Sequence, residues 1–177
     1  MRLFLAIDLP DVQKKELHGQ LVSLQKEYQI FNWVQEHNYH MTVHFFGEIL
    51  QPTGIVNSVK DLLYDKERFY LYALHLNYFF NHQITIFTQF KKEKRLTNLV
   101  DTLTTQFTPH RQEFIPHITV ARCRIPSKQQ YTLLKKKLEK TNIDLSFEVR
   151  ELTLFESILS KNKPLYLKIM TFPLIQP

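Results

Sequence analysis

Two short segments of the chain carry a histidine and a threonine two residues apart. They read His-Met-Thr-Val at residues 40–43 and His-Ile-Thr-Val at residues 117–120. Alternate side chains of a β-strand point to the same face, so each segment would present one imidazole and one hydroxyl together and turn its apolar side chains to a core. Histidine is the side chain best able to give or take a proton near neutral pH. The two segments therefore predict acid–base chemistry between two facing strands.

Two imidazoles on opposed walls fit a displacement at phosphorus. In-line attack requires a base at the attacking water and an acid at the departing oxygen, on opposite sides of the phosphorus atom. His40 and His117 can fill these two roles. The hydroxyls of Thr42 and Thr119 can donate hydrogen bonds to the non-bridging phosphate oxygens, where negative charge builds in the transition state. Such a mechanism requires no metal ion and no other cofactor.

Two further side chains share the alternation of the first segment. His44 makes a His-x-x-x-His pair with His40, which raises a metal site as an alternative. That spacing brings ligands together on a helix rather than on a strand, and few carboxylates lie nearby in the sequence, so we expect no metal. Phe46 is a candidate to stack on a nucleobase, and a core or rim position is its alternative. The expected core residues of this strand are Tyr39, Met41 and Phe45.

The elements that must position these residues follow from apolar periodicity and from proline punctuation. We expect strands at residues 3–9, 31–35, 39–46, 69–76, 83–90, 114–124, 145–155 and 165–172, and helices at 11–28, 53–64, 93–107 and from 126 through Leu138. A strand, a proline, a helix and two strands occur in this order twice, which predicts an internal duplication with two similar lobes. No Ser/Gly-rich linker separates the halves, so residues 1–177 are expected to form a single domain.

Composition narrows the class of protein. The chain has 177 residues, 44% of them hydrophobic, and only 3 Gly, which excludes collagen-like and disordered proteins. The single cysteine, Cys123, fits a reducing compartment, and Asp8 and Pro10 interrupt the apolar N-terminus before it reaches the length of a signal peptide. No stretch approaches the length of a membrane helix. The net charge of +6 favours polyanionic partners, and we expect a cytoplasmic protein.

Several blocks of the sequence resemble one known family. RLFLAIDLP at the start, NWV at 32–34, NYHMTVHFFGE at 38–48, FIPHITVARCR at 114–124 and LTLFES at 152–157 are similar to the two-histidine (2H) phosphoesterases. The closest branch is the LigT-like RNA 2′,3′-cyclic phosphodiesterases, historically called 2′-5′ RNA ligases. The resemblance implies a bilobal α+β fold in which two antiparallel sheets flank a central cleft and helices pack outside. It also implies hydrolysis of a terminal RNA 2′,3′-cyclic phosphate to a 2′-phosphomonoester.

The resemblance also implies which residues form the site. His40, Thr42, His117 and Thr119 carry over, and so does Arg122, which continues the second motif as H-x-T-x-x-R and would hold the phosphate. Our preferred assignment is His40 as the acid and His117 as the base, and the pseudo-symmetry leaves the reverse open. Strict alternation places Arg122 on the face opposite His117. We therefore predict that the strand bulges or ends near Ala121.

Other activities remain compatible with the same residues. The chemistry run backwards would join 2′-5′ RNA ends, and related substrates include 2′-5′ oligonucleotides and small cyclic phosphates. A non-catalytic RNA-binding module is a third hypothesis, which tight, salt-sensitive binding without turnover would reveal. The expected partners are RNA ends or nucleoside 2′,3′-cyclic phosphates. We expect a monomer with no membrane association and no obligate protein partner.

Overall fold

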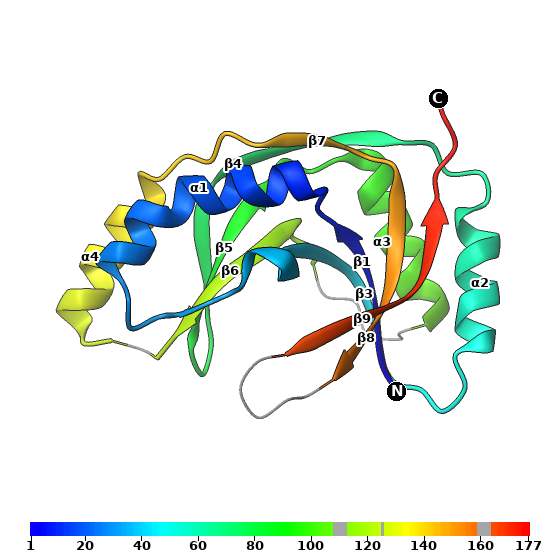
Figure 1. The fold of residues 1–177 in the computed structure, drawn as a ribbon, viewed down its shortest axis with the longest axis horizontal. Coiled ribbons are helices and arrows are strands. Elements are labelled where there is room, and N and C mark those ends of the chain that lie inside the picture. The colour runs from blue at the N-terminus through cyan, green and yellow to red at the C-terminus, as the bar shows by residue number, and fades with distance from the viewer. Residues whose placement is uncertain (108–112, 125, 159–163) are drawn as a thin grey trace.

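A computed structural model describes residues 1–107, 113–124, 126–158 and 164–177 (Figure 1). The elements in chain order are β1 (Arg2–Asp8), α1 (Asp11–Glu27), β2 (Asn32–Trp33), the 3₁₀ helix η1 (Glu36–Asn38), β3 (His40–Glu48), α2 (Thr53–Leu63), β4 (Phe69–Phe80), β5 (Ile84–Phe90), α3 (Lys94–Phe107), β6 (His117–Cys123), α4 (Lys128–Glu139), β7 (Ser146–Val149), β8 (Glu151–Ile158) and β9 (Leu165–Pro173). The two motifs begin β3 and β6, so each histidine is the first residue of its strand.

Within the described residues the strands form two antiparallel sheets. One has the order β3-β1-β8-β9 and the other the order β2-β6-β5-β4-β7. Each motif strand pairs with an earlier strand of the chain, and a long helix lies between the two in the sequence. β3 pairs with β1 across α1, and β6 pairs with β5 across α3. The order β3-β1-β8-β9 thus corresponds to β6-β5-β4-β7. The two lobes are therefore similar in the order of their paired strands, as expected from the sequence.

The repeat differs from the predicted one in two ways. The corresponding units are β1-α1-β3-α2 and β5-α3-β6-α4, not the strand-proline-helix units inferred from the sequence. Each sheet also takes strands from both halves of the chain, since β8 and β9 join β1 and β3. The single strand expected at 145–155 is two strands, β7 and β8, which lie in different sheets on either side of Arg150. Alternation of apolar and polar residues shows which side chains share a face of a strand, but it does not show which sheet the strand joins.

The helices tie the two lobes together. Although α1 connects β1 to β3, it lies beside α4 (Figure 1), and Lys137 Nζ of α4 is 2.8 Å from a carboxylate oxygen of Glu27. Gln20 of α1 donates to the Asp144 carbonyl at 2.7 Å and accepts from the Asp144 N–H at 2.8 Å. In the other lobe α3, which connects β5 to β6, contacts β3. One cluster of buried apolar side chains spans both sheets, so the cleft between them has rigid walls.

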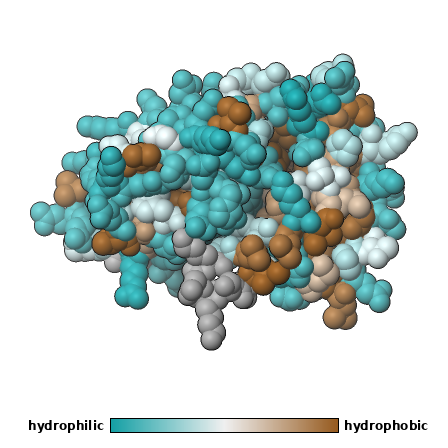
Figure 2. Space-filling model, viewed as in Figure 1, coloured by the Kyte–Doolittle hydropathy of each residue, from teal (hydrophilic) through white to brown (hydrophobic). Residues whose placement is uncertain are grey.

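The surface seen in Figure 2 is largely hydrophilic. Hydrophobic side chains gather in its lower right part, where Figure 1 places β8 and β9. Ile158, Leu165 and Leu167 of these strands are 37%, 49% and 42% exposed. Among the helices of the described residues, none carries an apolar stretch long enough to span a bilayer.

Candidate active site

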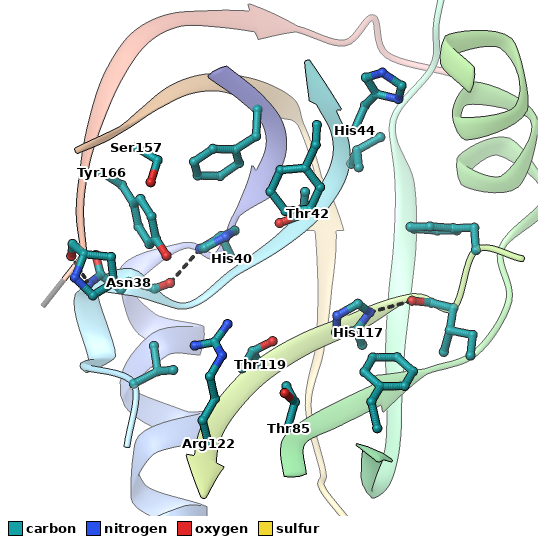
Figure 3. Close-up of a pocket in the computed structure, with 18 of the residues that line it drawn as sticks. Asn38, His40, Thr42, His44, Thr85, His117, Thr119, Arg122, Ser157 and Tyr166 are labelled. Atoms are coloured by element: carbon teal, nitrogen blue, oxygen red, sulfur yellow. Dashed lines mark hydrogen bonds between the residues drawn. The ribbon is translucent and has the colours of Figure 1, made fainter. Parts of the chain in front are cut away.

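A cleft of about 1230 Å³ lies between the two sheets, where β3 and β6 approach each other. Its walls include the residues that the motifs and the resemblance predicted, which are His40, Thr42, His117, Thr119 and Arg122. Figure 3 shows His40 and Thr42 on one strand and His117, Thr119 and Arg122 on the strand that faces it, with Tyr166 beside His40. The sequence therefore located both walls of one shared opening.

A bulge in β6 brings Arg122 into the cleft. Ala121 pairs with Ile86 of β5, whereas Thr119 pairs with the very next residue, Phe87, so Val120 is an extra residue without a partner on β5. The extra residue reverses the alternation, and Arg122 then faces the same side as Thr119. Figure 3 shows the guanidinium of Arg122 pointing into the space between β3 and β6. The predicted irregularity near Ala121 is confirmed.

The first motif contains the same bulge one position after its threonine. Thr42 pairs with Ala6 of β1 and His44 pairs with Leu5, so Val43 is the extra residue. His44 therefore lies on the face of β3 that carries the core side chain of Leu5, opposite the face of His40. The two histidines of the His-x-x-x-His spacing point to different sides of the strand. His44 also lines the cleft, although its side chain does not share a strand face with His40.

The bulge at Val43 also exchanges the roles expected for two phenylalanines. Phe45 pairs with Phe4, lines the cleft and is 66% exposed, so its assignment to the core is wrong. Phe46 is half-buried and packs against His44 and Phe107, with ring centroids 4.9 and 5.1 Å apart. Phe46 is not part of the cleft lining, so its selection as a site residue is wrong as well. Phe45 occupies the position in the first motif that Arg122 occupies in the second.

The two imidazoles are held in the same way. His40 Nδ1 is 2.7 Å from the Asn38 carbonyl oxygen, and His117 Nδ1 is 2.7 Å from the Ile115 carbonyl oxygen (Figure 3). A carbonyl oxygen only accepts hydrogen bonds, so Nδ1 of each ring carries a proton and donates it. In the neutral ring this leaves the lone pair on Nε2. Each histidine can therefore exchange a proton with a ligand through Nε2.

Aromatic side chains surround both rings. Between ring centroids, His40 lies 5.1 Å from Phe4, 6.1 Å from Phe155 and 5.0 Å from Tyr166. By the same measure, His117 lies 5.1 Å from Phe79 and 5.0 Å from Phe87. Edge and tilted contacts of this kind hold a ring in one orientation. The predicted site lacked these aromatic residues, because alternation within a strand does not show which distant strand will face it.

Burial lowers the pKa of His40 and of His117, because water solvates the charged imidazolium better than the partly apolar cleft does. The carbonyl of Asn38 or Ile115 opposes this effect on the pKa of its own ring. The positive charge of Arg122 lowers both pKa values further, which places the guanidinium within electrostatic reach of both rings. Two imidazoles beside the Arg122 guanidinium suit an anionic ligand.

Ser157 and Tyr166 complete the wall formed by β8 and β9. They pair across these two strands and both line the cleft. The block LTLFES at 152–157 marked Ser157 through the resemblance, but no chemical reason for it was visible in the sequence. No pattern in the sequence marked Tyr166, which lies on a strand predicted only as a strand.

Comparison with known proteins identifies the family. The family model described as the 2′-5′ RNA ligase superfamily matches residues 12–159. The chain belongs to this superfamily. The resemblance drawn from the paired motifs is thereby confirmed.

Curated relatives of this superfamily member share one name. The chain is 29% identical over 185 residues to an RNA 2′,3′-cyclic phosphodiesterase of Methanocaldococcus jannaschii, covering 94% of this chain and 96% of the relative. It is 25% identical over 188 residues to a Thermotoga maritima protein of the same name, covering 94% and 91%.

Solved structures share the fold. The structure of TT0787 from Thermus thermophilus matches with a TM-score of 0.75 at 22% identity and covers 98% of both chains. The apo structure of E. coli LigT matches with a TM-score of 0.75 at 21% identity and covers 99% of this chain and 98% of LigT. The expected α+β fold with two antiparallel sheets flanking a cleft is confirmed.

Proposed function

We propose that the protein hydrolyses the terminal 2′,3′-cyclic phosphate of RNA to a 2′-phosphomonoester. The observation that carries this proposal is the matched pair of imidazoles, each with Nδ1 fixed to a carbonyl and Nε2 available to one cleft that also holds Arg122. The names of the curated relatives support the substrate class. One chain supplies both histidines, so the reaction requires no second subunit.

The reaction follows from the two free Nε2 atoms. His117 Nε2 accepts a proton from water, and the water oxygen forms a bond to phosphorus. The bond from phosphorus to the 3′ oxygen breaks on the opposite side, and the departing oxygen takes a proton from His40 Nε2. The 2′-phosphate remains as the product, and solvent returns the histidines to their starting protonation states. Each histidine contributes roughly 10²- to 10⁴-fold to the rate as a general acid or base.

The phosphate charge is met by side chains of the cleft. Arg122 is the cation that affects both rings, and its planar guanidinium can donate two hydrogen bonds to two phosphate oxygens. The hydroxyls of Thr42 and Thr119 lie on the same strand faces as the histidines and donate to the remaining non-bridging oxygens. These donors stabilise the developing negative charge, so the proposed mechanism includes no metal step.

The nucleoside end of the substrate has aromatic partners in the cleft. Phe45 of β3 and Phe80 at the end of β4 both line it and are 66% and 54% exposed, which is unusual for rings of this size. An exposed ring beside a phosphate site offers a stacking surface to a base of any sequence. We propose that Phe45 takes the base-stacking role for which the sequence had suggested Phe46.

The decisive assay supplies a nucleoside 2′,3′-cyclic phosphate in the presence of a chelator and identifies the monoester formed. The proposal predicts the nucleoside 2′-monophosphate at a rate that EDTA leaves unchanged. Absence of turnover would refute the proposed activity, and salt-sensitive RNA binding in that case would indicate a binding module. Activity lost to EDTA and restored by a divalent ion would refute the metal-free mechanism. RNA fragments with a cyclic end and a 5′-hydroxyl partner separate hydrolysis from ligation.

A further inference from the structure

The two halves of the site match in backbone geometry but differ in one charged residue. His40 begins β3 and pairs with Asp8 of β1, and His117 begins β6 and pairs with Gln89 of β5. Since β1 and β5 hold the same place in the two sheet orders, Asp8 and Gln89 are equivalent positions. One histidine therefore has a carboxylate as its cross-strand neighbour, and the other has an uncharged amide. Cross-strand neighbours have their Cβ atoms about 4.5–5.5 Å apart.

Asp8 is held in place by two lysines from different elements. Lys14 Nζ of α1 lies 2.7 Å from one carboxylate oxygen, and Lys168 Nζ of β9 lies 2.7 Å from the other. The side chains of Asp8 and Lys14 are only 14% and 9% exposed, whereas that of Lys168 is 60% exposed. Each oxygen of the Asp8 carboxylate therefore has its own ammonium partner. His40 therefore has across the strand pair a carboxylate whose position is fixed by two ion pairs.

The surroundings of His117 lack this charge. Gln89 accepts a hydrogen bond from Asn77 Nδ2 at 2.8 Å, so its amide is engaged in an uncharged contact. The charged group that acts on His117 is Arg122. Glu113 also lines the cleft, but it is ion-paired with Lys92 at 2.8 Å. His117 thus faces a cation without a matching carboxylate among the described residues.

We infer that Asp8 is a positioning residue that makes His40 the proton donor of the pair, while Gln89 leaves His117 as the proton acceptor. This inference rests on the proposed function, in which one ring is an acid and the other a base. The charged and titratable groups around His40 are Asp8 on β1, Lys14 on α1, Arg122 on β6 and Tyr166 on β9, with Lys168 of β9 held on Asp8. Burial has the largest effect on the pKa of His40 and lowers it. The Asn38 carbonyl and the Asp8 carboxylate raise this pKa, whereas Lys14 and Arg122 lower it further. We therefore expect the exchanging proton to reside on His40 rather than on His117, although the ring of His40 is buried.

The test measures the pH dependence of kcat/KM for a nucleoside 2′,3′-cyclic phosphate. An acid must be protonated to act, so the limb of the profile at high pH reports the proton donor, and the limb at low pH reports the base. Asp8→Asn removes the carboxylate and is expected to move the high-pH limb down by about one pH unit. Lys168→Gln removes one cation from Asp8 and is expected to move the same limb up. If the ion pairs had only a structural role, Asp8→Asn and Lys168→Gln would not move the high-pH limb in opposite directions.

Gln89→Glu is the matched reciprocal variant. It places a carboxylate opposite His117, raises the pKa of that ring and is expected to move the low-pH limb up. If Asp8→Asn instead moves the low-pH limb, the roles of the two histidines are reversed and the inference is wrong. If none of the three variants moves a limb, Asp8 does not tune the pair.

NMR titration of the imidazole signals keeps the test independent of catalysis. In wild-type protein His40 is expected to titrate at a higher pH than His117, and the order is expected to reverse in the Asp8→Asn variant. Equal titration of both rings, or an order that the substitution leaves unchanged, would overturn the inference even if the protein hydrolyses the substrate. Absence of hydrolysis together with the expected titrations would refute the proposed function and leave the charge asymmetry intact. Asp8→Asn leaves the buried Lys14 without its ion-pair partner, and this variant can fail to fold for that reason. Lys168→Gln changes an exposed side chain, so in that case its shift of the high-pH limb tests the inference.

Discussion

Replacement of Arg122 by methionine tests how the phosphate is held. Methionine preserves much of the aliphatic length of the side chain and removes its charge and its donors. A hydrogen bond to a charged group contributes about 1.5–3 kcal/mol, so the loss of this contact lowers kcat/KM about 10- to 100-fold. Arg122 also lowers the pKa of both His40 and His117, so its removal is expected to shift both limbs of the pH profile to higher pH.

Arg124→Met is the matched control. Arg124 follows the end of β6, is exposed and is not part of the cleft lining, yet its loss changes the net charge by the same amount. The assay is steady-state hydrolysis of a nucleoside 2′,3′-cyclic phosphate between pH 5 and 9 at constant ionic strength. Comparable activity losses in the two variants, or an Arg122→Met enzyme within twofold of wild type with unmoved limbs, would refute the assignment.

Three further predictions concern the bulges and the buried rings. Phe45→Ala is expected to raise KM for the nucleotide with little change in Tm. Phe46→Ala is expected to lower the free energy of unfolding by about 1–3 kcal/mol and to leave KM unchanged. If enzyme kinetics and urea unfolding show the opposite pattern, the bulge at Val43 is misplaced. His44→Gln is expected to keep kcat within about threefold, because His44 lines the cleft but lies on the opposite face of β3 from His40 and Thr42. A loss as large as that of His40→Ala would contradict this. The folded-state pKa values of His40 and His117 are lowered, so the unfolded chain binds more protons below pH 6.5 and the free energy of unfolding falls as the pH drops through this region. His117→Asn is expected to flatten this dependence in urea titrations, and an unchanged slope would count against the lowered pKa.

The bulges mark the limit of prediction from the sequence. Alternation placed His40 with Thr42 and His117 with Thr119 correctly, because both pairs precede the irregular residue. It failed beyond Val43, since a bulge adds one residue and leaves no signature in an apolar run. For Arg122 the resemblance required a cationic residue in the cleft, and this requirement revealed the bulge. The same step applied to the first motif would have selected Phe45 in place of Phe46.

Long-range pairing accounts for the remaining differences. Tyr166 reaches His40 only because β9 is added to the sheet of β3 and β1 through β8, and this order depends on the switch between sheets at Arg150. Local periodicity predicted the strands on both sides of Arg150 but not their separation. The equivalence of Asp8 and Gln89 likewise becomes visible only when the register of both strand pairs is known.

The central claim is that one phosphate group lies between two imidazoles. A crystal structure of the protein with a bound nucleoside 2′-monophosphate tests this directly. We expect Nε2 of His40 and Nε2 of His117 both to lie within about 3.2 Å of oxygens of the nucleotide, with the Arg122 guanidinium on the same phosphate. A phosphate that contacts only one of the two rings, or that binds outside the cleft between β3 and β6, would contradict it.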